Sequence, residues 1–329
     1  MTPDPRIEQV AACGFTERQA RFLVTVMLHA GVCLGRQYCA ASGIARGQVM
    51  HDFFRMLIDR DLATAYPRAH GHTHVYHVHA KRLYEAVGEA NSRFRRPPPL
   101  ARAVERVMVL DAVLAEAELR WLATEREKVS HFTRQTRLQP HEFPHLTFGT
   151  PPSTTVRYFP DKLPIGVDSA TWRHVFVYLV TRHLPVDFRS FLHRHAELLR
   201  ALPEWTIRLL LPRHLAGVIG RYQAAVRDEL ATPLRADTFA ELRWFFEQRR
   251  RAPDRPAVVA DARFQRAQEV FATPRFRVLY RNWLQYGESA LEATLSPVLS
   301  DALERRTGAL EWRVLEHDYQ HLAALVGTA

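Results

Sequence analysis

Residues 16–61 decide the fold of the N-terminal part of this chain, and they read TERQARFLVTVMLHAGVCLGRQYCAASGIARGQVMHDFFRMLIDRD. The run opens with Thr16 and, three residues later, Gln19, which is the spacing of a capping box at the start of a helix. The residues that share one face of the following segment are Phe22, Leu23, Val26, Met27 and Ala30. This periodicity predicts an amphipathic helix over residues 16–30.

Two further helices are expected before residue 62. A short helix is predicted over 36–42, because Gly43 can adopt the left-handed conformation that commonly ends a helix. A longer helix is predicted over 45–61 from a stripe with helical spacing. That stripe consists of Val49, Phe53, Met56, Leu57 and Arg60, in which the apolar residues lead.

A hairpin is expected next, because two β-rich segments, 62–68 and 75–79, flank the turn-prone residues 70–73. Helix, short helix, turn, helix and hairpin is the order of a winged helix-turn-helix, so we assign residues 1–96 to such a DNA-binding domain. Its third helix would be the recognition helix, which lies in the major groove of DNA. The residues expected to contact DNA are Arg36, Arg46, Gln48, His51, Arg55, Arg68, His70, His72 and His74.

The hairpin is rich in histidine, with His70, His72, His74, His77 and His79. Histidines two apart on a strand share a face and can bind a metal ion together. These five are divided between two faces, and no cysteine or acid nearby completes a ligand set. We therefore expect no metal site here and interpret the hairpin tip, with Arg68, as a contact to the DNA backbone.

Composition and charge narrow the class of protein. The 329 residues are 47% apolar and 24% charged, which excludes a disordered chain, and the three cysteines are too few for a disulfide framework. Neither a membrane-spanning run nor an apolar signal core is present, so we expect a cytoplasmic chain without membrane contact. Of the 45 basic residues only three are lysine, so 42 are arginine, and the net charge is +10. This balance makes nucleic acid the leading class of partner.

Prolines divide the chain into three parts. Pro97, Pro98 and Pro99 form a stiff spacer after residue 96, and a second break lies at 139–155. Residues 97–150 are therefore assigned to a spacer, a long helix over 100–128 and a linker. The helix carries a seven-residue apolar repeat, formed by Ala103, Val107, Leu110, Leu114, Ala117 and Trp121. Two interpretations fit this repeat equally: a buried helix, or the seam of a homodimer through residues 103–121.

The C-terminal part, residues 151–329, alternates strands and helices. Strands are predicted over 156–159, 174–180 and 205–211, with a helix over 188–202 between the last two. Further helices are expected over 213–231, 237–250, 262–273 and 296–306, followed by a late strand over 310–315. The predicted fold class is therefore α+β and mostly helical: an N-terminal winged helix-turn-helix, a long helix and an α/β C-terminal domain.

The order of these elements resembles the replication-relaxation type of proteins found on plasmids and integrative elements. The matching residues are Ser42-Gly43 with 45–61, and Phe159-Pro160-Asp161 followed by 174–180. The resemblance implies a bacterial mobile-element protein whose C-terminal domain is similar to PD-(D/E)xK nuclease folds. The chain departs from that pattern, because the second strand has no acid and no lysine to join Asp161 in binding Mg²⁺. A degenerate core is thus expected, with Asp161 as a strand-end or turn residue.

Other catalytic patterns are weak. The chain has no glycine-rich phosphate loop, no HExxH and no GxSxG motif. His193 and His195 are two apart on a predicted helix and diverge, so the segment 191–195 is interpreted as a mixed helix surface. Tyr280, with Arg275, Arg277 and Arg281 nearby, has the residue types of a strand transferase, but an arginine-rich chain brings such groups together by chance. No catalytic residue, cofactor or metal is predicted.

The sequence therefore predicts a sequence-specific protein that binds double-stranded DNA, acting as a regulator or replication accessory of a mobile element. One alternative is a DNA-processing enzyme, nuclease-like or a strand transferase, with an unrecognised C-terminal active site. Another is a protein-docking adaptor, because winged domains also bind proteins.

Overall fold

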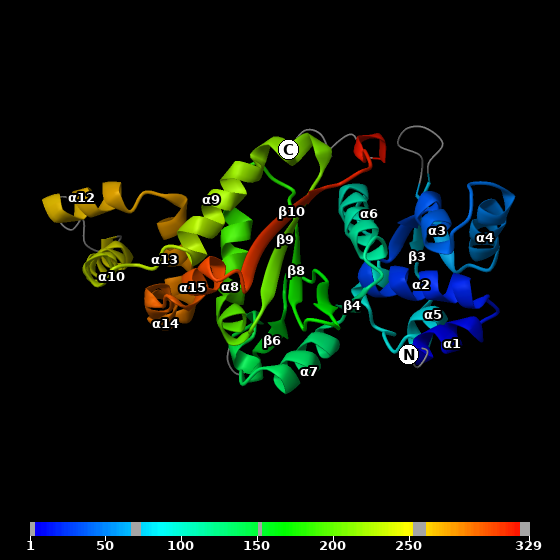
Figure 1. The fold of residues 1–329 in the computed structure, drawn as a ribbon, viewed down its shortest axis with the longest axis horizontal. Helices are drawn as coiled ribbons and strands as arrows, with labels where there is room; N and C mark the ends of the chain where they lie inside the picture. The colour runs from blue at the N-terminus through cyan, green and yellow to red at the C-terminus, as the bar shows by residue number, and fades with distance from the viewer. Residues whose placement is uncertain (1–3, 67–73, 151–152, 253–260, 323–329) are drawn as a thin grey trace.

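The computed structural model describes residues 4–66, 74–150, 153–252 and 261–322, and its class is α+β (Figure 1). Several helices and a three-stranded sheet form the N-terminal part, and a five-stranded sheet lies at the centre of the molecule. Within the described ranges, no helix is both long and apolar enough to cross a membrane.

The N-terminal helices begin and end where the sequence signals place them. Thr16 and Gln19 form a capping box at the start of the second helix. Gly43, with φ of 63°, ends the next helix in the left-handed conformation. The elements are α1 (Pro5–Ala11), α2 (Glu17–His29), β1 (Val32–Leu34), α3 (Gly35–Ser42), α4 (Gln48–Asp59), β2 (Ala63–Ala65), β3 (Val75–Val78), α5 (Lys81–Ala86) and η1 (Arg93–Arg95).

The three short strands form an antiparallel sheet in the order β1-β3-β2. In the register of this sheet, His77 of β3 lies opposite Val32 and Thr64. The predicted hairpin is therefore present as β2 and β3, and a third strand, β1, which the sequence analysis did not anticipate, completes the sheet. The His77 ring is 1% exposed and its Nε2 lies 2.8 Å from the carbonyl oxygen of Phe94, so this histidine belongs to the core.

The predicted long helix over 100–128 is wrong. Helix α6 (Leu100–Leu114) ends early, β4 (Leu119–Leu122) follows as a strand, and α7 (Glu125–Gln135) starts at a new capping box of Thr124 and Glu127. Trp121 thus belongs to a strand and not to a helical repeat. Pairing of β4 with β7 (Ile165–Asp168) brings Trp121 opposite Gly166, and this tertiary contact overrides the local helical pattern.

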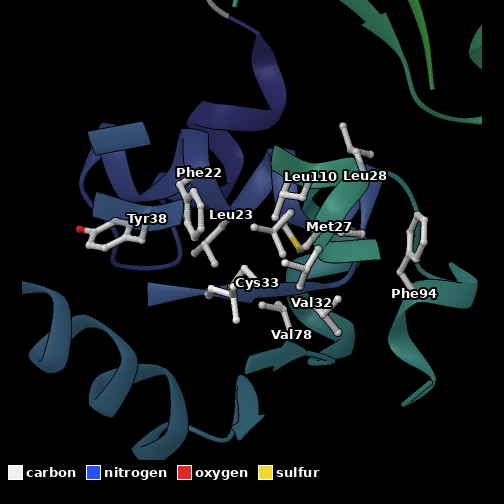
Figure 2. Close-up of a cluster of buried hydrophobic side chains, with 14 of the residues drawn as sticks. Phe22, Leu23, Met27, Leu28, Val32, Cys33, Tyr38, Val78, Phe94 and Leu110 are labelled. Carbon is white, nitrogen blue, oxygen red and sulfur yellow. The ribbon is translucent and has the colours of Figure 1, made fainter. Parts of the chain in front are cut away.

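The apolar stripe of α6 is core and not a dimer seam. Ala103, Val107 and Leu110 are completely buried within the chain. Figure 2 shows Leu110 among the side chains of α2, beside Leu23 and Met27. The other side of α6 meets the central sheet, because Val175 and Val177 belong to the same apolar cluster. The homodimer expected through residues 103–121 therefore has no exposed stripe to use.

The central sheet has the strand order β10-β9-β8-β7-β4. Strands β8, β9 and β10 run parallel, whereas β7 and β4 are antiparallel to their neighbours. In β8, Val175, Val177 and Leu179 pack on the cluster around α6, and Phe176 packs on the opposite face. The additional elements of this part are β5 (His145–Phe148), β6 (Thr155–Tyr158), β8 (His174–Leu179), α8 (Val186–Ala201), β9 (Trp205–Leu211), η3 (Arg213–Val218), α9 (Ile219–Leu230) and η2 (Pro140–Glu142).

A third apolar cluster lies among the helices between α9 and β10, at the left of Figure 1. Phe245, Phe246 and Trp283 are its largest buried rings. The elements here are α10 (Ala236–Arg251), α12 (Ala262–Val270), α13 (Pro274–Tyr286), α14 (Ser289–Glu292), η5 (Ala293–Leu295), α15 (Val298–Glu304), β10 (Gly308–Val314) and η6 (Gln320–Leu322). Helix α13, which carries Tyr280, was not predicted.

The segment 97–150 does not form a linker between two separate bodies. Its residues supply α6 to the N-terminal core, β4 to the central sheet and α7 to the apolar cluster that includes Phe132. The N-terminal and C-terminal parts therefore share α6 as a common element.

Candidate nucleic-acid interface

Helix α4 has one anchored face and one free face. Phe53, Phe54 and Leu57 are at most 2% exposed and hold the inner face. The Phe53 ring stacks on Tyr38 of α3 at 4.2 Å between centroids, and Phe54 stacks on Tyr76 of β3 at 3.9 Å. Stacked rings of this kind fix the helix against both α3 and the small sheet. In Figure 1, α4 lies at the right-hand edge, away from the central sheet.

The free face of α4 brings four of the predicted DNA-contacting residues together. Arg46 lies just before the helix and is exposed, as are Gln48, His51 and Arg55. Gln48 Nε2 donates to Asp52 Oδ1 at 2.6 Å, and Arg55 lies 3.4 Å from the same atom. The carboxylate thus preorganises an amide and a guanidinium along one face, and those are the side chains that read purine edges.

Val49 was expected in the apolar stripe of this helix, and that expectation is wrong. Its side chain is 64% exposed and lies on the free face. The stripe bends away from Val49 because the helix begins at Gln48, where nothing packs above its first turn. An exposed aliphatic group on such a face can contact the methyl group of thymine.

The structure places the remaining predicted residues apart from α4. Arg68, His70 and His72 lie outside the described residues. His74 precedes β3, is half-buried, and has its ring 5.9 Å from that of Tyr76.

Arg36 points into the molecule instead of outward. Its Nη1 donates to Asp111 of α6 at 2.7 Å, and its guanidinium lies 5.6 Å from the ring of Tyr319. The Tyr319 hydroxyl donates to the same carboxylate at 2.6 Å. Since Arg36 is committed to this contact, we leave it out of the candidate DNA surface.

The sequence analysis missed a second basic cluster, around Phe94. Arg93 and Arg106 lie on its ring, at 4.7 and 5.0 Å from the centroid. Arg93 Nη2 also lies 3.5 Å from the carbonyl oxygen of Lys162. Burial, together with the nearby Arg106 and Arg102, lowers the pKa of Arg93 to about 10. The run Arg93 to Arg96 was visible in the sequence, but its only interpretation there was a domain boundary.

Asp161, the one acid of the nuclease-like pattern, lies in a turn and faces a base. The Arg194 guanidinium of α8 pairs with the Asp161 carboxylate. His193 pairs with Glu229 at 2.8 Å, and His195 is 3% exposed. The interpretation of 191–195 as a mixed helix surface is therefore wrong, because the segment forms internal polar contacts.

Lys128 is an unusual buried group near Asp161. Its side chain is buried, and Nζ donates to the carbonyl oxygen of Leu163 at 2.6 Å. Burial lowers the pKa of Lys128 to about 7, and the nearby Arg93 contributes in the same direction. The cavity beside Asp161 and His195 holds about 10 Å³, which is too small for a substrate. We therefore treat Lys128 as a structural group.

A second buried pair joins α7 to β8. The Nε2 atoms of His131 and His174 are 2.9 Å apart, and Arg120 of β4 lies 3.1 Å from Nδ1 of His131. Since Arg120 can only donate, His131 carries its proton on Nε2 and donates it to His174. Burial lowers the pKa of each histidine to about 4, so both rings are neutral.

The chemistry of the described ranges gives no metal centre: no three His, Cys, Asp or Glu side chains there come together as ligands. Comparison of the chain with family models, curated proteins and solved structures finds no match. The function is therefore argued from the residues alone.

Proposed function

We propose that the chain binds double-stranded DNA through the free face of α4, in the manner of a winged helix-turn-helix. The observation that carries this proposal is the division of α4 into an aromatic face, fixed by Tyr38 and Tyr76, and a wholly exposed face with base-reading groups. A helix held this way can enter the major groove without disturbing its own core.

The order of the small sheet and the charge of the chain support the same function. Strands β1, β3 and β2 pair antiparallel after the third helix, which is the arrangement of a wing. The net charge of +10 favours association with a polyanion. We infer a sequence-specific role, such as a regulator or replication accessory of a mobile element, because Gln48 and Arg46 can each form bidentate contacts with a base.

The first experiment measures the affinity of the full chain for a labelled 30-bp duplex of mixed sequence across a salt series. The double variant Arg46→Gln, Arg55→Gln should bind more weakly. Its salt slope should be shallower by about 2, since each lost phosphate contact removes about 0.9 from the slope. Arg281→Gln is the matched control, because Arg281 is also an exposed arginine within a helix and lies on α13. Equal effects of both variants would reject the α4 interface.

The second experiment separates base reading from backbone binding. Duplexes selected from a random 20-bp library by the wild-type chain are compared with the unselected pool. Gln48→Ala should cost about 1–3 kcal/mol on the selected sequence and much less on the pool, because only the selected duplex offers the bidentate partner. If selection yields no enriched sequence, the protein binds DNA without sequence specificity and this part of the proposal is wrong.

A further inference from the structure

The largest cavity among the described residues is a cleft of about 1400 Å³ between the N-terminal helices and the edge of the central sheet. Its walls come from α1, α2, β4 and α7. Strand β4 is the last strand of the five-stranded sheet, so the cleft follows an open sheet edge. The α4 surface has no part in it, because no residue of α4 lines the cleft.

Arginine dominates the walls of this cleft. The lining arginines are Arg6, Arg18, Arg21, Arg120, Arg126 and Arg134, and the lining carboxylates are Asp4, Glu17 and Glu127. Arg6 pairs with Glu127, and Arg21 with Glu17, each at 2.7 Å. Among the described residues, Arg18, Arg120 and Arg134 have no carboxylate within 4 Å. These three cations are therefore available to an anionic ligand.

Two tryptophans line the same cleft. Trp121 lies on β4, opposite Gly166, where a Cβ atom would come within 3.4 Å of the indole ring. Trp172 lies in the turn between β7 and β8, is 53% exposed, and has a φ of 59°. Positive φ is strained for a bulky residue, and Trp172 gains little packing in return. Strain of this kind, held by a fixed turn, is frequent where a side chain is presented to a ligand.

The turn that presents Trp172 is well determined. The Trp172 N–H donates to the carbonyl oxygen of Asp168 at 2.8 Å, and the Asp168 carboxylate accepts from the backbone N–H of Ala170 at 2.8 Å. The indole is thus held at the cleft without being buried. An exposed aromatic platform beside unpaired arginines is the combination that binds unstacked bases together with their phosphates.

We propose that this cleft binds single-stranded nucleic acid, with its phosphates along the arginines and its bases stacked on Trp121 and Trp172. The volume exceeds the roughly 300–1,000 Å³ of small-molecule pockets, which favours a polymer. Bases in a duplex are stacked on one another and cannot reach an indole face, whereas those of a single strand can. The excess of arginine over carboxylate also favours nucleic acid over an acidic peptide added as a strand to β4, which would require few cations. The site is separate from α4 and does not depend on the proposed duplex function.

The decisive experiment measures anisotropy of a labelled 20-nucleotide oligo-dT with the full chain. Trp172→Ala should weaken binding about tenfold, since stacking of one base on an aromatic ring is worth roughly that much or more. Trp312→Ala on β10 is the matched control, because Trp312 is 51% exposed and does not line the cleft. Equal affinities of the two variants would overturn the proposal.

A second variant tests the arginines. Arg18→Gln, Arg134→Gln should make the salt slope for oligo-dT shallower by about 1.4, since each phosphate contributes about 0.7 in a single strand. Arg281→Gln should leave the slope unchanged. Unchanged slopes in both variants would show that the cleft does not hold the strand.

The probes also separate the alternatives. A 20-bp duplex that competes with oligo-dT as well as unlabelled oligo-dT does would overturn the assignment to single strands. A glutamate-rich peptide that binds the chain while oligo-dT does not would indicate peptide docking on β4 instead. The α4 variant Arg46→Gln, Arg55→Gln should retain oligo-dT binding, so failure of the duplex proposal and failure of this one are distinguishable. Comparison of oligo-dT with oligo-rU then identifies DNA or RNA as the source of the strand.

Discussion

Single buried charges show where this protein gives up stability. Lys128 is 2% exposed, and its ammonium has one close acceptor, the carbonyl oxygen of Leu163. A buried lysine is held in its neutral form more easily than in its charged form, so its pKa falls. The unfolded chain therefore binds a proton at Lys128 over a pH range in which the folded chain does not.

This difference predicts a dependence of stability on pH. The pKa of Lys128 is about 7 in the folded chain, and the model value is 10.5. Between these values the unfolded state binds more protons, so the free energy of unfolding rises as pH rises. From pH 7 to pH 9 the gain from this residue should be about 2 kcal/mol. Lys128→Met should lose this gain in urea unfolding at the two pH values.

Lys81 is the control for that measurement, because it lies on α5 with a side chain that is 62% exposed. Lys81→Met should keep the pH dependence of the wild type. If Lys128→Met also keeps it, the ammonium of Lys128 has access to water that its burial does not indicate.

Among the elements, α6 connects the two parts of the molecule, and its stripe is the clearest test of core against interface. Leu110→Ala should lower the free energy of unfolding by about 2–5 kcal/mol, because a fully buried leucine leaves a cavity when truncated. The molar mass by light scattering should not change. Leu284→Ala, at a position 53% exposed on α13, should change stability by less than about 0.5 kcal/mol. Loss of a dimer on Leu110→Ala without loss of stability would restore the seam interpretation.

The sequence predicted elements well wherever the signal was local. The capping box of Thr16 and Gln19 and the left-handed Gly43 each act through neighbouring atoms, and both appear as expected. Strands β8 and β9 were also recognised, because a buried parallel strand is a continuous apolar run.

Elements that depend on distant partners were not predictable in the same way. Leu119–Leu122 is a strand only because β7 lies beside it, with Gly166 making room for Trp121. A seven-residue repeat has the same spacing in a buried helix and in a coiled-coil seam, so the stripe of α6 could not decide between them. The cleft was missed for the same reason, since its arginines come from four elements far apart in sequence.

For the candidate site, the sequence predicted the residues of α4 and misjudged Arg36. Helical periodicity places Gln48, His51 and Arg55 on the face opposite Phe53, which needs no tertiary information. Arg36 looked equally polar, but its partner Asp111 is 75 residues away. Nothing near Arg36 in the sequence indicates that contact.

At the scale of the whole molecule, the N-terminal domain is not complete at residue 96. The side chain of Gln37 in α3 is 1% exposed and its Nε2 donates to the carbonyl oxygen of Val107 at 3.0 Å. Arg36 pairs with Asp111, and Leu110 fills the core beside α2 (Figure 2). All three contacts cross from the helix-turn-helix to α6. Without α6, a buried amide and a paired guanidinium would lose their partners, and the apolar face of α2 would be exposed to water.

We therefore expect a fragment of residues 1–96 to unfold without cooperativity, whereas a fragment of residues 1–115 should melt in a single transition. Removing the α6 partners leaves polar groups unsatisfied, at about 1–3 kcal/mol each, and removes buried leucine and valine side chains that stabilise the core further. Thermal melts followed by circular dichroism on both fragments test this expectation. A cooperative melt of 1–96 at the temperature of 1–115 would show that α6 only covers the domain. The duplex affinity of the α4 face should follow the same division, because a helix whose aromatic anchors are loose cannot be held rigidly against a groove.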